Sequence, residues 1–366
     1  MGAKSMNTRK WLYSLLILII ALETAGCSLS GPVRERNKVN LKVIIAGSLL
    51  VPFQALEKEF ERANPDIDVL LEGHGSVQVI RSVTELNDKA DIIAVADAQL
   101  IPLMMYSTII PKSSRPYADW HINFAANKLG IAYKNDSAYS SEINADNWYS
   151  IISRPDVTIG LADPRIDAMG YRTLMSIQLA EDYYHDQSIF EKCISSAFNP
   201  PISIIKNGDL SLIKVPEIIS STKQKVKLRS YSIQLMALLE SGDLDYSFEY
   251  ESVARQRGLK FLSLPEGIDL SNSDYEKQYQ KVKVSLDFKR FASVVPDFKG
   301  TQIVYGVTIP NNVSHPEEAG RFIKFLLGPN GRRIFSQCHQ TFLVNPECDN
   351  FLALPEDLMP YFTWRN

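Results

Sequence analysis

The pattern of hydrophobic and polar positions is clearest over residues 41–65, LKVIIAGSLLVPFQALEKEFERANP. The apolar run at 41–46 is rich in valine and isoleucine, which is typical of a buried strand. Beyond Gly47-Ser48, apolar residues recur at helical spacing between charged ones until Asn64-Pro65. The pattern therefore predicts a strand and a helix that are joined by a Gly-Ser turn.

The chemistry of this turn suits an anion. Gly47 and Ser48 offer backbone N–H groups and a hydroxyl at the positive end of the predicted helix dipole. The alternative is an ordinary strand-to-helix loop, in which small residues are common. One such turn therefore leaves both interpretations open.

A second Gly-Ser turn follows in the next unit. A strand at 67–71 leads into Gly75-Ser76 and a helix at about 77–87, and a third strand follows at 90–95. Alternating strands and helices predict a parallel sheet, in which both turns lie at the carboxyl edge where ligands bind. The repeated turn favours an oxyanion site over an ordinary loop.

The remaining pattern predicts a second lobe. The segment 120–133 is interpreted as a crossover into it, and the apolar strand 302–309 as the return. Helices at 316–327 and as far as 336 then complete the first lobe. Within the second lobe we expect strands at 157–161, 211–215, 225–228 and 246–250, helices at 171–184 and 232–240, and an irregular connection at 186–207.

The N-terminus has the features of an export signal. Lys4, Arg9 and Lys10 precede an apolar run of twelve residues, and Thr24-Ala25-Gly26-Cys27 supplies small residues for cleavage. Small residues before Cys27 resemble a lipoprotein signal, and an uncleaved anchor is the alternative. We therefore expect an exported, extracellular protein anchored to the cell membrane. The expected segments are a signal peptide at 1–27, a tether at 28–40, the first lobe at 41–125, the second lobe at 126–302 and the returning first lobe at 303–366.

Composition narrows the choice of partners. The 366 residues carry a net charge of −3 and 45% hydrophobic residues, without a basic stripe that would indicate a nucleic-acid partner. We expect a monomer in which local dipoles, not bulk charge, hold an anion. Cys338 and Cys348 either form a disulfide, which would leave Cys193 unpaired, or are buried as small hydrophobic side chains.

A third strand-to-helix loop, at 162–170, contains two acids. Asp163 and Asp167 are good turn and helix-capping residues, which explains at least one of them. A carboxylate that faces an anion is repulsive unless it is protonated or binds the central atom directly. Molybdate and tungstate have metal centres that accept additional ligands, whereas sulfate and phosphate do not.

Several segments together resemble the archaeal-type tungstate/molybdate-binding proteins, the extracellular solute-binding components of ABC transporters. The resemblance covers roughly residues 41–335, in the family's order. The segments that carry it are AGSL, GSVQVIR, KADIIAVAD, MGYRTLMSIQLAEDYY, LLESGDLDYSFEYESVA and IVYGVTIP. The resemblance implies an α/β, two-lobed type II periplasmic-binding-protein fold that closes over one oxyanion and delivers it to a permease.

The family's contacts can be carried over residue by residue. The resemblance implies first-lobe contacts at Gly47, Ser48 and Ser76, and second-lobe contacts at Asp167-Ala168-Met169 and Tyr250. In the family the aspartate is usually followed by Pro-Cys-Gly-Tyr-Arg, which differs here at two positions. Asp167 would be the direct ligand of the oxyanion metal, and no cofactor is implied.

One family position lacks its acid. Members of the family carry a glutamate shortly before the Leu-Glu-Ser-Gly segment, and that position here is Ser232 within RSYSIQL. Glu240 and Glu249 are the nearby substitutes, although their expected roles are those of helix-end or surface residues. Our hypothesis is that the protein keeps one carboxylate near the metal or binds a tetrahedral oxyanion by hydrogen bonds alone.

Alternative functions follow from the same residues. Gly73-His74-Gly75-Ser76 suggests a nucleophilic serine, but the Gly-x-Ser-x-Gly motif of hydrolases is absent, and the five histidines show no metal-binding spacing. We therefore predict a binding protein for tungstate or molybdate, not an enzyme. A binder of sulfate, phosphate or thiosulfate and a diverged paralogue are the alternatives, ahead of a secreted hydrolase.

Overall fold

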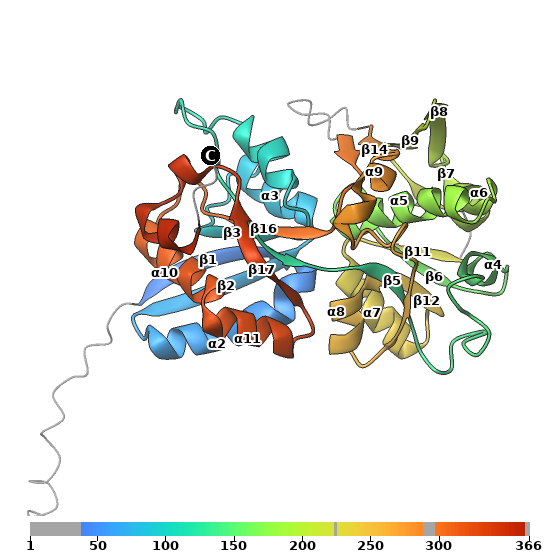
Figure 1. Ribbon diagram of the computed structural model, residues 1–366, viewed down its shortest axis with the longest axis horizontal. Helices are drawn as coiled ribbons and strands as arrows, with labels where there is room; N and C mark the ends of the chain where they lie inside the picture. The colour runs from blue at the N-terminus through green and yellow to red at the C-terminus, as the bar shows by residue number, and fades with distance from the viewer. Residues whose placement is uncertain (1–37, 223–224, 288–296, 363–366) are drawn as a thin grey trace, which may run out of the picture. The chain divides into compact units, whose positions relative to one another are not determined.

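Valine and isoleucine residues form much of β1 (Val39–Ala46), which lies inside the six-stranded sheet, the first of the two larger mixed sheets in the computed structural model (Figure 1). The structure describes residues 38–222, 225–287 and 297–362, so the predicted signal peptide, Cys27 and most of the tether lie outside it. The described residues from Val39 onward form one compact unit. The division of this unit into lobes at 125/126 and 302/303 stays a prediction.

The first sheet has the order β17-β4-β16-β3-β1-β2. β1 is parallel to β2 and β3, as the pattern predicts, and the later strands are antiparallel to their neighbours. The edge strand β17 was not expected from the sequence. Besides β1, the strands of this sheet are β2 (Ile67–His74), β3 (Ile92–Val95), β4 (Ile122–Ala126), β16 (Val304–Thr308) and β17 (Thr341–Cys348).

Helices cover both faces of this sheet, with α3 on one face and α2 and α11 on the other (Figure 1). The apolar stripe of α2 packs on α10 through Phe60 and Phe322, whose ring centroids are 5.0 Å apart. The helices are α2 (Leu50–Ala63), α3 (Ser76–Thr84), α10 (Pro316–Leu327) and α11 (Pro329–Gln337), and a π-helical turn η2 (Pro102–Tyr106) follows β3.

The second sheet has the order β11-β6-β12-β5-β13. Its strands are β5 (Leu129–Tyr133), β6 (Ile159–Ala162), β11 (Val226–Arg229), β12 (Tyr246–Tyr250) and β13 (Lys260–Ser263). Its helices are α4 (Trp148–Ile152), α5 (Ala168–Tyr183), α7 (Ser232–Ser241) and α8 (Glu251–Gln256). The chain enters this sheet between β4 and β5 and returns to the first sheet at β16, as expected for a crossover and a return.

The segment 186–207 is not an irregular connection, as the sequence suggested. It contains α6 (Ile189–Cys193), a short turn η3 (Ser195–Ala197) and two strands. Strand β7 pairs with β10 in a two-stranded sheet, and strand β8 is the edge strand of a four-stranded sheet with the order β15-β14-β9-β8. The strands are β7 (Phe198–Asn199), β8 (Ser203–Asn207), β9 (Leu210–Val215), β10 (Ser220–Ser221), β14 (Val282–Leu286) and β15 (Asp297–Lys299), and α9 (Glu276–Tyr279) precedes β14.

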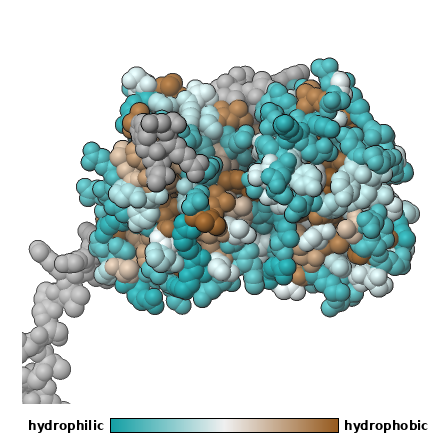
Figure 2. Space-filling model, in the orientation of Figure 1, coloured by the Kyte–Doolittle hydropathy of each residue, from teal (hydrophilic) through white to brown (hydrophobic). Residues whose placement is uncertain are grey.

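Hydrophobic residues are concentrated inside the unit, and the face in Figure 2 is largely hydrophilic with separate hydrophobic clusters. Among the described residues, no helix combines the length and apolar character needed to cross a membrane. The three described cysteines are free thiols, with Cys193 buried and Cys338 and Cys348 half-buried. The predicted alternative of a disulfide between Cys338 and Cys348 is therefore wrong.

Candidate functional site

The two Gly-Ser turns lie side by side at the carboxyl edge of the first sheet. Ala46 at the end of β1 pairs with His74 at the end of β2, so Gly47-Ser48 and Gly75-Ser76 leave the sheet next to each other. Gly47 begins a short 3₁₀ turn, η1 (Gly47–Leu49), and Ser76 is the first residue of α3. The sequence prediction of two adjacent turns is confirmed.

The hydroxyl of Ser48 accepts a hydrogen bond from a neighbouring side chain, which leaves its own proton available to a ligand. Tyr305 on β16 donates its O–H to Ser48 Oγ at 3.0 Å, and Tyr305 itself accepts from Asn127 Nδ2 at 3.1 Å. Because the bond to Ser48 occupies an acceptor site, its own proton can be donated to a ligand. No other hydrogen bond engages this hydroxyl among the described residues. Neither Tyr305 nor Asn127 was singled out from the sequence.

The hydroxyl of Ser76 has the same arrangement. The backbone N–H of Ala96 donates to Ser76 Oγ at 3.0 Å, and Ser76 is fully buried. The next N–H groups of α3, from Val77 and Gln78, both point to the carbonyl oxygen of Ile166 at 3.1 and 3.3 Å. These two N–H groups of α3 are therefore engaged by the loop before α5.

Asp167 caps α5 and ties that helix to α7. Its Oδ1 accepts from the N–H of Met169 at 3.1 Å and its Oδ2 from the N–H of Ser232 at 2.9 Å. Burial raises the pKa of Asp167 to about 6, although these two bonds favour the ionised form. Ala168 and Met169 begin the helix and are fully buried. The structural role of Asp167 as a helix cap is confirmed.

Glu249 is the acid that the sequence analysis misjudged. It was interpreted as a helix-end or surface residue, yet it is fully buried on β12. Its Oε1 accepts from the N–H of Tyr250 at 2.8 Å and from Ser232 Oγ at 3.2 Å, and its Oε2 has no hydrogen-bond partner among the residues that the structure describes. Burial raises the pKa of Glu249 to about 8, and the nearby charge of Asp167 adds to this effect.

The structure thus brings two carboxyl groups to the position where the sequence lacks an acid. Both Asp167 and Glu249 accept a hydrogen bond from Ser232, one from its N–H and one from its hydroxyl. Glu240, in contrast, lies at the other end of α7, about 12 Å along the helix from Ser232. It is exposed and pairs with Arg257 at 3.7 Å, so the structure does not bring it to this cluster.

Tyr250 lies at the end of β12 beside Tyr305, with ring centroids 6.0 Å apart. Arg172 of α5 donates from Nη1 to the phenol oxygen at 2.8 Å. Because a guanidinium only donates, the Tyr250 oxygen is an acceptor in this bond and its proton can be donated elsewhere. Tyr250 is therefore the third buried hydroxyl of the cluster with an available proton.

Contacts between residues of the two sheets bring these groups together. Ile166 accepts the two α3 hydrogen bonds, and a Cβ atom on Gly47 would lie 3.5 Å from Ile233 of α7. Ser48 and Ser76 therefore belong to the same region as Asp167, Ser232 and Tyr250. Three hydroxyl donors, beside a Glu249 carboxyl whose pKa burial raises, suit an oxyanion whose oxygens are all acceptors.

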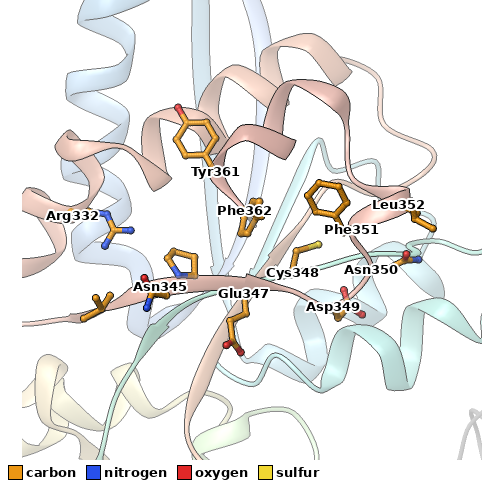
Figure 3. Close-up of a pocket in the computed structure, with 12 residues that line it drawn as sticks. Arg332, Asn345, Glu347, Cys348, Asp349, Asn350, Phe351, Leu352, Tyr361 and Phe362 are labelled. Atoms are coloured by element: carbon orange, nitrogen blue, oxygen red, sulfur yellow. The ribbon is translucent and has the colours of Figure 1, made fainter. Parts of the chain in front are cut away.

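A cavity elsewhere in the molecule does not contain these residues. A cavity of about 690 Å³ lies between the end of β17, Arg332 of α11 and the turn at 356–361, and Figure 3 shows the residues that line it. Asp349 in its wall accepts hydrogen bonds from the N–H of His121 at 2.7 Å and from Tyr106 at 2.8 Å, which is a structural role. Over the described ranges, no group of three His, Cys, Asp or Glu residues is arranged to hold a metal ion.

The family of the chain follows from its sequence. A model of the bacterial extracellular solute-binding protein family matches residues 41–338, and the chain belongs to this family. The molybdate/tungstate-binding protein WtpA of Pyrococcus abyssi is 38% identical over 354 residues, which cover 94% of this chain and 95% of that protein. An uncharacterized solute-binding protein of Methanoculleus marisnigri is also 38% identical, over 84% of this chain and 83% of that protein.

A solved structure supports the fold. The sulfate-binding protein SubI from Mycobacterium tuberculosis superposes with a TM-score of 0.51 at 12% sequence identity, covering 83% of this chain and 86% of that one. The predicted α/β fold of the type II periplasmic-binding proteins is confirmed. The predicted resemblance to the tungstate/molybdate-binding proteins agrees with the similarity to WtpA from Pyrococcus abyssi.

Proposed function

We propose that this protein is the solute-binding component of an ABC transporter and that it binds tungstate or molybdate. The observation that carries the proposal is the set of three buried hydroxyls, from Ser48, Ser76 and Tyr250, whose bonds to fixed donors leave their protons available. The name of the Pyrococcus abyssi relative supports this choice of anion. A fully deprotonated dianion offers only acceptors, so this donor set disfavours protonated phosphate.

The proposal includes the setting in which the protein works. The two sheets with their helices form lobes that close over the anion, and a permease receives it. The N-terminal segment directs export, Cys27 carries the lipid anchor, and the protein acts as a monomer on the extracellular face of the membrane. Membership of an extracellular solute-binding family supports export.

A binding role is also favoured over hydrolysis. The Oγ of Ser76 accepts a hydrogen bond from the N–H of Ala96. No hydrogen bond links Ser76 to a histidine in the part of the chain that the structure describes. A serine nucleophile needs a base within hydrogen-bond reach. Ser76 is therefore proposed as a ligand donor and not as a nucleophile.

Titration of the purified full-length chain with molybdate, tungstate, sulfate and phosphate tests the proposal. We expect molybdate and tungstate to raise the melting temperature and to release or absorb heat in calorimetry, because a ligand that binds only the native state stabilises it. Ser48→Ala removes one donor and should weaken both anions by about tenfold or more. Binding of sulfate or phosphate alone would change the proposed ligand, and binding of none of the four would refute an oxyanion carrier.

X-ray absorption on the tungstate complex should show four metal–oxygen bonds. Backbone hydrogen bonds hold both oxygens of Asp167 in its role as a helix cap, and burial raises the pKa of Glu249 to about 8, so both groups are disfavoured as additional metal ligands. We therefore propose tetrahedral binding by hydrogen bonds, which is one of the two alternatives from the sequence. A six-coordinate spectrum that requires two protein carboxylates would contradict it.

A further inference from the structure

Arg172 is the cationic side chain at the candidate site, and it is almost completely buried, with 2% of its surface exposed. It belongs to α5 beside the second sheet, and it contacts both sheets. Its Nη1 donates to the carbonyl oxygen of Ala96, at the end of β3 in the first sheet, at 2.6 Å. The same nitrogen donates to the hydroxyl of Tyr250, at the end of β12 in the second sheet, at 2.8 Å.

The charge of Arg172 is already balanced by protein. Its Nη2 lies 3.4 Å from Oδ1 of Asp97 but forms no hydrogen bond with a described residue, and Tyr171 donates to the other oxygen of Asp97 at 2.6 Å. Tyr171 is in turn fixed by stacking on Phe298, with ring centroids 4.2 Å apart. Burial of a guanidinium is tolerated when a carboxylate neutralises it. Arg172 is thus anchored by contacts that involve no ligand.

The hydrogen bonds of Arg172 continue to a second candidate ligand group. Ala96 accepts from Arg172 through its carbonyl oxygen and donates to Ser76 through its N–H. A continuous series of bonds therefore runs from Tyr250 through Arg172 and Ala96 to Ser76. It joins one hydroxyl donor at the second sheet to another at the first sheet.

The direction of each bond in this series is fixed by chemistry. A guanidinium and a backbone N–H are donors only, so the hydroxyl oxygens of Tyr250 and Ser76 must be the acceptors. Each hydroxyl then keeps its proton for a different partner. Without Arg172, the Tyr250 hydroxyl would be free to rotate and to donate to a nearby acceptor such as the carbonyl oxygen of Ala96.

We propose that Arg172 is a positioning residue that fixes the Tyr250 hydroxyl as a donor toward the bound anion and holds it against the first sheet. This inference rests on the proposed function, because it assigns a role within the oxyanion site. In it, Arg172 acts mainly through its hydrogen bond to Tyr250, because Asp97 offsets the charge of the guanidinium. The consequence is that the benefit of Arg172 to binding depends on the phenol oxygen.

A double-mutant cycle tests this dependence, with tungstate and molybdate as probes. The variants are Arg172→Lys, which keeps the charge but loses the planar fork, Tyr250→Phe, which loses only the hydroxyl, and the double variant. We expect each single change to weaken anion binding by about tenfold or more. The affinity of the double variant should be no lower than that of the single variant with the lower affinity, because the two changes remove the same interaction. Melting temperatures without anion show whether each variant is folded.

The matched control is Arg165→Lys. Arg165 also pairs with an aspartate, Asp163, at 2.6 Å, but its remaining bond goes to the carbonyl oxygen of Glu217 and not to a candidate ligand group. This variant should bind the anions with wild-type affinity. A general loss on changing any arginine–aspartate pair would instead lower the affinity of the control as well and would overturn the assignment.

The outcomes separate the inference from the function on which it rests. Wild-type protein that binds none of the anions refutes the oxyanion function and the inference with it. Wild-type binding with additive effects of the two changes, or with an unaffected Arg172→Lys variant, refutes the inference alone. If Arg172→Lys does not fold, Asp97→Asn takes its place in the cycle, because it releases the anchor of Arg172; additivity with Tyr250→Phe then overturns the proposal.

Discussion

Replacing Gly75 by alanine should weaken tungstate binding by about 100-fold while the protein stays folded. Gly75 precedes α3, and a Cβ atom there would lie 2.5 Å from the carbonyl oxygen of Ile166, in the loop that caps the second-sheet helix α5. The backbone of Gly75 has φ −67° and ψ 145°, which alanine adopts without strain. The substitution therefore disturbs the contact between the two proposed lobes and not the fold of either one.

The measurements are calorimetric titration with tungstate and thermal unfolding without it. Gly73→Ala is the matched control, because its Cβ would be 3.6 Å from Leu50, an ordinary contact distance, two residues earlier in the chain. We expect Gly73→Ala to bind normally. Wild-type affinity in the Gly75→Ala variant would show that the close approach of Gly75 and Ile166 is not needed to hold the anion.

Glu249→Gln should gain stability relative to the wild type as the pH rises from about 5 to 8. The pKa of Glu249 is raised from 4.5 to about 8 by burial, so in this window the native state keeps a proton that the unfolded state releases. Wild-type stability is therefore lost as the pH rises toward 8, and the loss is complete above it. At about 1.4 kcal/mol per pKa unit, the relative gain of the variant is on the order of 3–5 kcal/mol.

Urea unfolding at a series of pH values between 5 and 9 measures this difference. Asp167 also has a raised pKa, of about 6, but it is present in both proteins, so its contribution to the pH dependence of stability largely cancels in the comparison. Glu240→Gln is the control, because that side chain is 43% exposed and belongs to the same region of the sequence. Parallel stability curves for Glu249→Gln and the wild type would contradict the assignment of a buried, protonated Glu249.

Local pattern was sufficient to predict the parallel part of the first sheet and its two turns. Strand β1, helix α2 and the Gly-Ser turns are each defined by fewer than twenty consecutive residues, and the parallel arrangement then places both turns at one edge. Ser48 and Ser76 could be identified for that reason. Their partners could not, because Tyr305 approaches Ser48 from a strand more than 250 residues later in the chain.

Glu249 shows why the second half of the site was harder to predict. An acid in the segment YSFEY suggests a strand with one face in water, but β12 lies between β6 and β5 and all five of its residues are buried. Helices on both faces of a central strand remove the alternation on which such a prediction depends. The segment 186–207 was also misjudged, because its strands are very short: β8 pairs with the next strand, β9, in a hairpin, and β7 pairs through Asn199 with Ser220 of β10.

The two hydrogen bonds from α3 to Ile166 separate affinity from selectivity in this carrier. They join backbone atoms only, so their strength depends neither on the side chains of the site nor on which anion lies beside them. Solutes that allow the same approach of α3 to Ile166 therefore share this contribution to closure. We expect the hydroxyl and carboxyl groups, which face the solute directly, to account for the preference between such solutes, so substitutions there should change selectivity more than closure.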